Sequence, residues 1–165
     1  MADDIVIMAV SDDHGLEGFK EAYDKAVKLY GHIDYVLHAG DVEYHGNKYY
    51  EDICKCPFIV VRGNNDYNDN PYDREFTIGG KRFLLTHGHK YGVYMGVSNL
   101  FYTAKEKNVD MVVFGHTHKA YYMEHEGVHI LNPGSLTLPR GGREGTFAVI
   151  FVKNNKISVN HIVLS

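Results

Sequence analysis

The sequence has no tryptophan, only two cysteines and no excess of positive charge. Cys54 and Cys56 are separated by one residue, a spacing that suits neither a disulfide framework nor a four-ligand zinc site. We therefore expect two free thiols in a reducing compartment. The 17 Lys and Arg against 21 Asp and Glu give a net charge of −4, which offers no basic field to a nucleic-acid backbone, so we expect no stable nucleic-acid binding.

Long hydrophobic runs are missing as well. The apolar run at residues 5–10 follows an acidic start and is too short for the core of a secretory signal. No stretch approaches the roughly 20 apolar residues of a membrane span. These absences predict a cytoplasmic protein without a membrane partner. The 165 residues, of which 44% are hydrophobic, exclude a disordered tail and favour a single domain over residues 1–165.

Short apolar runs recur along the chain and predict buried strands at residues 5–10, 35–37, 58–61, 83–85, 111–114 and 147–152. Helical periodicity from Leu16 to Tyr30 and from Val93 to Ala104 predicts two crossover helices, and a less regular pattern at residues 44–53 predicts another. A strand, helix and strand in succession imply parallel pairing. The turn pairs Gly79-Gly80, Glu126-Gly127 and Asn154-Asn155 predict hairpins. We expect mixed sheets, parallel in the N-terminal half with antiparallel strands added later.

Polar residues follow five of these strands directly. In an open α/β sheet, ligands bind beyond the carboxyl ends of the strands, so the five segments are expected to converge. They combine carboxylates, imidazoles and an amide without a thiolate, a set that suits Mn, Fe, Zn or Ni. The segments are Ser11-Asp12-Asp13-His14, His38-Ala39-Gly40-Asp41, Arg62-Gly63-Asn64-Asn65-Asp66, Thr86-His87-Gly88-His89 and Gly115-His116-Thr117-His118.

Seven candidate donors in these segments exceed what one ion needs. Two ions that share a bridging carboxylate would use all of them, and such pairs, about 3.5 to 4 Å apart, serve in-line displacement at phosphorus. Glycines at positions 40, 63, 88 and 115 would let the chain approach an ion or a phosphate closely. The candidate donors are Asp12, His14, Asp41, Asn64, His87, His116 and His118.

The five segments, in this order and spacing, resemble the signature blocks of the calcineurin-like metallophosphoesterases. More narrowly, they are similar to the YfcE-like branch of small bacterial and archaeal phosphodiesterases, through Ser11-Asp12-x-His14-Gly15, Gly40-Asp41-Val42-x-x-His45-Gly46, Arg62-Gly63-Asn64, Leu85-Thr86-His87-Gly88-His89 and Asn132-Pro133-Gly134-Ser135. The resemblance covers nearly the whole chain. It implies an α/β fold, a four-layer α/β/β/α sandwich of two mixed sheets that forms a single metallophosphoesterase domain.

The resemblance also assigns ligands. The first ion would be held by Asp12, His14, Asp41 and His118. The second would be held by Asp41, Asn64, His87 and His116, with Asp41 as the bridge. A water or hydroxide between the ions would attack phosphorus, because a bound cation lowers the pKa of water. The implied enzyme is a phosphodiesterase that hydrolyses P–O bonds of small phosphoesters with two divalent ions. We expect manganese, with nickel, iron, zinc or magnesium as alternatives.

The third segment departs from the family pattern. Many members carry a histidine that aids the leaving group where this chain has Asn65, and an amide cannot donate an acidic proton. This implies either weaker action on esters with poor leaving groups or a substitute donor, for which His45 and His89 are candidates. Asp66, which orients that histidine in the family, is left with another task, such as steadying its loop.

Two further groups of residues are candidates for substrate contact. Arg62 precedes Gly63, and Arg140 and Arg143 flank Gly141-Gly142. Arginine suits bidentate contact with phosphate, but a structural salt bridge for Arg62 and a solvated loop for the other two are alternatives. The 13 tyrosines suit either a substrate cleft or a subunit interface, so a homo-oligomer stays open.

Two other functions are compatible with the same fold. A catalytically silent interaction scaffold, like the retromer subunit that resembles this family, would need altered donor positions, and here all seven are retained. A phosphomonoesterase for nucleotides or proteins is disfavoured by Asn65 and by the small size of the chain, which leaves little room for a specificity cap. His38, which precedes Gly40-Asp41 within the strand, is either a partner of the site or a satisfied core histidine.

Overall fold

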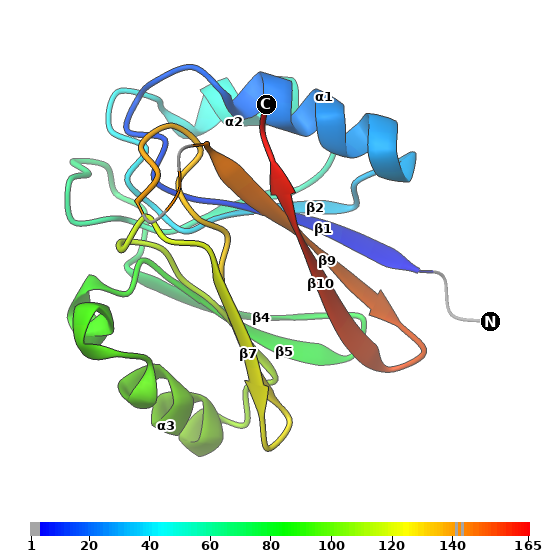
Figure 1. Cartoon of the computed structure of the whole chain (residues 1–165), viewed down its shortest axis with the longest axis vertical. Helices are drawn as coiled ribbons and strands as arrows, with labels where there is room; N and C mark the ends of the chain where they lie inside the picture. The colour runs from blue at the N-terminus through cyan, green and yellow to red at the C-terminus, as the bar shows by residue number, and fades with distance from the viewer. Residues whose placement is uncertain (1–3, 141, 143) are drawn as a thin grey trace.

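The computed structural model describes residues 4–140, 142 and 144–165. Two five-stranded sheets pack face to face, and helices cover the outer face of each, so the layers run α/β/β/α (Figure 1). This confirms the predicted sandwich of two mixed sheets. None of the helices in the described part of the chain is long and apolar enough to cross a bilayer.

The first sheet has the strand order β10-β9-β1-β2-β3. Its central strand β1 pairs in parallel with β2 and antiparallel with β9, which makes the sheet mixed. The strands are β1 (Ile5–Val10), β2 (Tyr35–His38), β3 (Phe58–Val60), β9 (Thr146–Lys153) and β10 (Lys156–Val163). The helices on its outer face are α1 (Phe19–Tyr30) and α2 (Asn47–Ile53).

The second sheet has the order β4-β5-β6-β8-β7. Its strands are β4 (Asp73–Ile78), β5 (Lys81–Thr86), β6 (Met111–Val113), β7 (Tyr121–His125) and β8 (Val128–Asn132). The outer helix is α3 (Ser98–Lys107). Two 3₁₀ turns, η1 (His89–Tyr91) and η2 (Val93–Met95), connect β5 to α3.

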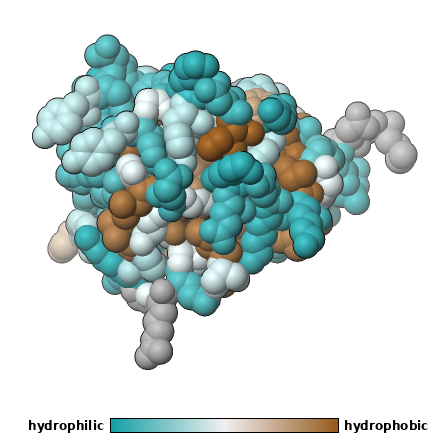
Figure 2. Space-filling model, turned by 90° about the horizontal axis from the view of Figure 1, so that it is seen from above, coloured by the Kyte–Doolittle hydropathy of each residue, from teal (hydrophilic) through white to brown (hydrophobic). Residues whose placement is uncertain are grey.

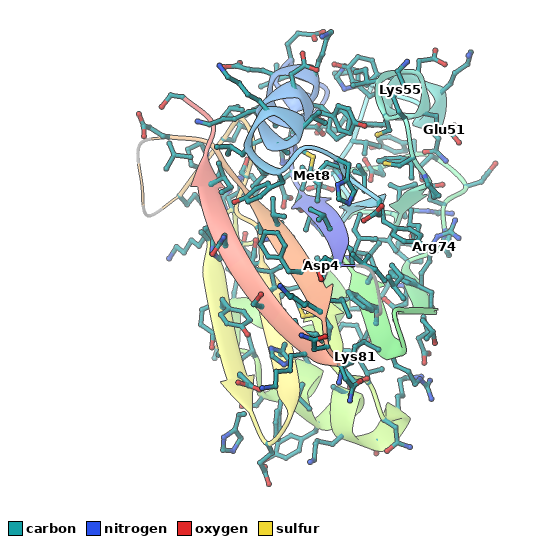
Figure 3. All side chains as sticks on the ribbon, turned by 90° about the vertical axis from the view of Figure 1, so that its right-hand side faces the viewer. Asp4, Met8, Glu51, Lys55, Arg74 and Lys81 are labelled. Atoms are coloured by element: carbon teal, nitrogen blue, oxygen red, sulfur yellow. The ribbon has the colours of Figure 1, made fainter. Side chains whose placement is uncertain are left out.

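Strand β1 shows how the sequence determines the layers. Side chains alternate along a strand, so Val6, Met8 and Val10 pack under the helices while Ile7 and Ala9 pack against the second sheet. Burial on both faces explains the unbroken apolar run. In Figure 3, Met8 lies beneath the helical layer that carries Glu51 and Lys55, and Lys81 lies far from it, at the β4–β5 turn.

Three expectations needed correction. Helix α1 begins at Phe19 and not at Leu16, which is 48% exposed. The second periodic segment is interrupted by Gly96, with φ of 120°, so its first turn is η2 and the helix begins at Ser98. Parallel pairing is not confined to the N-terminal half, because β5, β6 and β8 form a second parallel set. The crossover through α3 joins two parallel neighbouring strands, β5 and β6, just as the crossover through α1 joins β1 and β2.

The predicted hairpins are all present. Their turns join β4 to β5, β7 to β8 and β9 to β10. Asn154 and Asn155 both have positive φ, 51° and 61°, as a two-residue turn that matches the strand twist requires. The loops after β1, β2, β3, β5 and β6 gather at one edge of the molecule, on the left in Figure 1, and this convergence forms the candidate site.

Candidate metal centre

The first group of predicted donors meets where the loops after β1, β2 and β6 come together. Ligand atoms of Asp12, His14, Asp41 and His118 all lie within 4.8 Å of one another. His14 Nε2 is 3.1 Å from His118 Nε2 and 3.6 Å from Asp41 Oδ2. Two donors that each lie about 2.1 Å from a shared ion can be up to about 4.2 Å apart. The separations of 3.1 and 3.6 Å at His14 Nε2 lie within this limit and suit a shared small cation.

The second group lies on the other side of Asp41. His116 Nδ1 is 3.0 Å from Asn64 Oδ1 and 3.2 Å from His87 Nε2. His87 Nε2 is in turn 3.4 Å from Asp41 Oδ2, the same oxygen that faces His14. The structure thus brings together all seven predicted donors, in two groups that share the Asp41 carboxylate.

Hydrogen bonds to carbonyl or carboxylate oxygens orient three of the four donor imidazoles. His87 Nδ1 donates to the carbonyl of Ala39 at 2.7 Å, and His118 Nδ1 donates to the carbonyl of Leu138 at 2.8 Å. His14 Nδ1 donates to Glu43 Oε1 at 3.2 Å. Each bond leaves the Nε2 lone pair directed into the centre, as in metal sites whose histidines are oriented by outer partners. The Nε2 atoms of His14 and His118 thus face each other at 3.1 Å, a separation that a bound cation can bridge.

Asp12 provides independent evidence that the residues suit a cation. Its side chain is buried, and its Oδ2 accepts hydrogen bonds from the His116 backbone N–H and from the Ser11 hydroxyl. Its Oδ1 is buried and has no hydrogen-bond partner among the described residues. An unpaired buried carboxylate oxygen is costly. It is also the oxygen that lies 3.4 Å from His118 Nε2, so the residues present fit a bound metal ion.

The pKa shifts are those of an anion-rich centre. Burial opposes protonation of His87 and His118, yet Asp41 and Asp12 outweigh it and raise the pKa of both. Burial and the neighbouring His87 lower the pKa of His116 to about 4, so this imidazole is neutral near pH 7. A metal ion would be stabilised by the same negative potential that favours protonation of His87 and His118, so protonation and metal binding compete for these nitrogens.

The donors sit on a strained backbone. Five of the seven have positive φ: Asp12 (56°), His14 (51°), Asp41 (63°), His116 (72°) and His118 (61°). Such conformations are uncommon for residues other than glycine and cluster at functional sites. The loops also approach one another very closely, because a Cβ at Gly63 would lie 2.1 Å from Asp41 Oδ1. Only glycine fits there.

The third segment supports the donor carboxylates. Asn65 donates from its backbone N–H to Asp41 Oδ1 at 2.9 Å and from its side-chain amide to Asp41 Oδ2 at 3.0 Å. Asp66 accepts from the backbone N–H groups of Asp41, Glu43 and Gly63 at 2.8 to 2.9 Å. Asp66 therefore steadies the loops around Asp41, the task suggested for it above. Asn65 orients the Asp41 carboxylate, and its catalytic role stays a prediction.

The two candidate proton donors, His89 and His45, have different neighbours. His89 has its ring 5.4 Å from that of His87 and 6.0 Å from that of His116, and its buried Nδ1 has no partner among the described residues. His45 stacks on Tyr49, with its Nδ1 3.4 Å from the Tyr50 hydroxyl. Burial lowers the pKa of His89, which makes it mainly neutral near pH 7. Which of them serves a leaving group stays a prediction.

The arginines differ in their surroundings. Arg62 donates from Nε to the Asn70 carbonyl at 3.0 Å and lies over the ring of Tyr72 at 4.7 Å, so neighbouring residues hold its guanidinium. No carboxylate among the described residues pairs with it, so the predicted alternative of a salt bridge is absent there. Arg140 donates to the Tyr94 hydroxyl at 2.8 Å, next to His116. Arg143 lies outside the described residues.

Sequence reasoning missed a buried network behind the first group. Asp13 and Tyr50 are fully buried, and the Tyr50 hydroxyl donates to Asp13 Oδ2 at 2.6 Å. His38 Nδ1 accepts from the Gly40 N–H at 3.0 Å, and its Nε2 lies 3.3 Å from Asp13 Oδ1. Burial alone would raise the pKa of Asp13. The interactions with His38, His45 and Tyr50 outweigh this effect and lower the pKa to about 2. The network ties the Asp12 loop to the Asp41 loop.

Tyr50→Phe is expected to destabilise the protein by about 1.5 to 3 kcal/mol, because it removes a hydrogen bond to a buried carboxylate. The free energy of unfolding in urea measures the effect. Tyr49→Phe is the matched control, since that neighbouring hydroxyl donates to the exposed Glu17 at 3.1 Å and its loss should change stability by less than about 0.5 kcal/mol. Equal losses for the two variants would contradict a special role for the Asp13 network.

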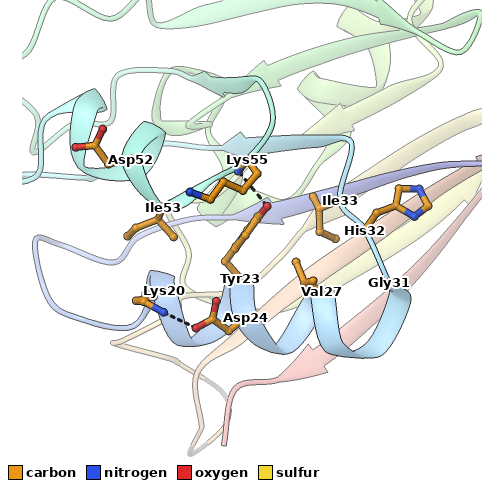
Figure 4. Close-up of a pocket in the computed structure, with 10 residues that line it drawn as sticks. All are labelled: Lys20, Tyr23, Asp24, Val27, Gly31, His32, Ile33, Asp52, Ile53 and Lys55. Atoms are coloured by element: carbon orange, nitrogen blue, oxygen red, sulfur yellow. Dashed lines mark hydrogen bonds and ion pairs between the residues drawn. The ribbon is translucent and has the colours of Figure 1, made fainter.

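A second hollow of the molecule lies away from these donors. The outer face of the α1–α2 layer is mainly hydrophilic, with apolar patches between polar side chains (Figure 2). On this face Tyr23, Val27, Ile33 and Ile53 line a groove of about 630 Å³ (Figure 4). None of the seven donors lines it. The groove is therefore separate from the candidate centre.

Comparison with known proteins agrees with this geometry. The model of the calcineurin-like phosphoesterase superfamily domain matches residues 5–155. The chain belongs to this family. Members are metal-dependent phosphoesterases, which agrees with the predicted resemblance and with hydrolase activity on phosphoesters. The chain is 32% identical over 154 residues to the probable metallophosphoesterase YsnB of Bacillus subtilis, with 93% of this chain and 88% of YsnB covered.

Solved structures of family relatives share the fold. A predicted phosphoesterase of Streptococcus pneumoniae is 26% identical, with a TM-score of 0.83 over 99% of this chain and 92% of that one. Two others show the fold alone. A novel archaeal phosphodiesterase is 23% identical, with a TM-score of 0.74 over 96% of this chain and 99% of its own. Zinc-bound Vps29 of Entamoeba histolytica is 19% identical, with a TM-score of 0.74 over 98% of this chain and 100% of its own.

Proposed function

We propose that this phosphoesterase uses two divalent metal ions and hydrolyses small phosphodiesters in the cytoplasm. The observation that carries the proposal is the placement of the Asp41 carboxylate between two donor groups, with Oδ2 at 3.6 Å from His14 Nε2 and 3.4 Å from His87 Nε2. Dinuclear centres of oxygen and imidazole donors are suited to displacement at phosphorus. When bound, the ions would supply Lewis acidity and a water of lowered pKa, and manganese is our first choice.

The protein's own residues prepare this chemistry before substrate arrives. Outer partners hold His14, His87 and His118 with their Nε2 lone pairs inward, so the donors need no rearrangement. Asn64 is exposed and His116 partly so, whereas Asp12, Asp41 and His87 are buried. The open side of the centre therefore lies by Asn64 and His116, and substrate would approach there.

Asn65 supports the proposal that the preferred substrates are esters with good leaving groups. Its amide is engaged by Asp41 and cannot protonate a departing oxygen. The likeness in fold to an archaeal phosphodiesterase supports a diester over a monoester. The likeness in fold to Vps29 keeps the scaffold alternative as an outcome of the test.

The test is to strip the metal with a chelator, restore manganese, nickel or magnesium separately, and assay bis(4-nitrophenyl) phosphate beside 4-nitrophenyl phosphate. We expect manganese to restore hydrolysis, with the higher kcat/KM for the diester. Faster hydrolysis of the monoester would replace the proposal by a phosphomonoesterase. Hydrolysis of neither ester with any ion would favour the scaffold.

A further inference from the structure

A pocket of about 330 Å³ lies next to the candidate metal centre. Turn η2 and the two residues that follow it form one side, and the segment that leads from β6 to β7 forms the other. We call it the aryl pocket, and six of its lining residues are Val93, Tyr94, Val97, Phe114, Lys119 and Tyr121. Its volume is in the range of small-molecule sites. No predicted donor lines it, so it is a site in addition to the metal centre.

Tyr94 is the wall between the aryl pocket and the centre. Its ring centroid lies 4.7 Å from that of the donor His116, and its hydroxyl donates to the His116 carbonyl at 3.3 Å. Arg140 Nη1 donates to the same hydroxyl at 2.8 Å. These bonds hold the ring in place although it is 62% exposed. The contacts of Tyr94 with His116 place the aryl pocket directly beside this donor, within reach of a substituent on a phosphate bound there.

The walls of the aryl pocket suit a flat aromatic ring. Tyr94 and Tyr121 offer rings that are 62% and 39% exposed, and Phe114 lies 6.5 Å from Tyr121 in an edge-on arrangement. Aromatic rings favour such offset and edge contacts with one another. Lys119 on the lining and Arg140 on the Tyr94 hydroxyl add positive charge beside the pocket, which complements an anionic phosphoester.

We propose that the aryl pocket binds the aromatic substituent of the substrate while its phosphate lies at the metal centre. The inference rests on the proposed function and specifies its substrate class, a phosphodiester that carries an aromatic ring. The ring is either attached directly to the phosphate, as in an aryl ester, or carried by a sugar, as in a nucleotide ester.

The experiment is calorimetric titration of the manganese-loaded protein with three phosphonates that have no ester bond to hydrolyse. Methylphosphonate has no ring, phenylphosphonate carries the ring on phosphorus, and the 5′-phosphonate of adenosine carries it on a sugar. We expect at least one ring-bearing compound to bind about 10-fold more tightly than methylphosphonate. Preference for phenylphosphonate alone identifies an aryl ester, and preference for the adenosine compound alone identifies a nucleotide ester.

Ala120→Trp is the variant that tests the location. Ala120 lines the aryl pocket and is exposed, so an indole can fill the pocket without disturbing the core. We expect it to abolish the preference for the ring and to leave methylphosphonate affinity unchanged. Lys105→Trp is the matched control, because it adds the same side chain at an exposed position of α3 outside the pocket.

Three results would overturn the aryl pocket: equal affinity for all three compounds, binding of none of them, or a preference that survives Ala120→Trp. Hydrolysis of bis(4-nitrophenyl) phosphate by the same preparation is measured in parallel. Loss of the ring preference with hydrolysis intact refutes the pocket alone. A ring preference in protein that hydrolyses no phosphoester refutes the proposed function alone.

Discussion

Asp41→Asn is expected to lower kcat/KM for a phosphodiester by more than about 100-fold, which exceeds the loss typical of removing an outer partner of a metal ligand. Asp41 Oδ2 faces both donor groups, and both of its oxygens accept hydrogen bonds from Asn65. An amide has the same shape but carries no charge, and its NH₂ group must replace one of these two acceptors. Both ions should therefore bind more weakly while the fold is kept.

The measurement combines steady-state kinetics with metal content and a circular-dichroism melt. Asp69→Asn is the matched control, because Asp69 is an exposed carboxylate in the loop that carries Asn64 and Asn65. It should retain activity within about 2-fold, as expected of a surface position away from the centre. Activity of Asp41→Asn within a few-fold of wild type would contradict a bridging role.

Much of the fold could be predicted because its elements follow from local patterns. The apolar run at residues 5–10 indicates a strand buried on both faces, and β1 is buried between the helical layer and the second sheet. Turn pairs such as Asn154-Asn155 need only two residues to be recognised. The start of α1 was less accurate, because Leu16 continues the helical period in sequence but precedes the helix and is half exposed.

The convergence of the seven candidate donors could be predicted for the same reason. Each follows a buried strand directly, so the sheet topology alone brings them to one edge. The contacts of Tyr50 and Arg62 could not be predicted from the sequence. They depend on how α2 packs over the first sheet and on how the loop after β3 folds back. One signal was available for the buried network: Asp13 follows Asp12 at the end of a buried strand, and two adjacent buried carboxylates need partners.

Manganese is expected to raise the Tm of the metal-stripped protein by about 5 to 10 °C when its concentration is about 100-fold above its Kd. Binding to the folded state alone then contributes about 2.7 kcal/mol, and each kcal/mol shifts the Tm of a chain of this size by about 2 to 4 °C. The donor set suits this binding, because Asp12 Oδ1 is buried with no hydrogen-bond partner among the described residues and the Nε2 atoms of His14 and His118 face each other at 3.1 Å. A bound cation would contact all three atoms. An unchanged Tm would contradict metal binding.

The number of manganese ions that the loaded protein holds tests whether there are two. His118→Ala removes a donor of the first group only, and His116→Ala removes a donor of the second group only, so each variant should bind one ion where the wild type binds two. His32→Ala is the control, because this imidazole is exposed, pairs with Asp34 and should leave the stoichiometry unchanged. Native mass spectrometry counts the ions directly. A single ion in the wild type, lost in His118→Ala and kept in His116→Ala, would reduce the centre to the first group.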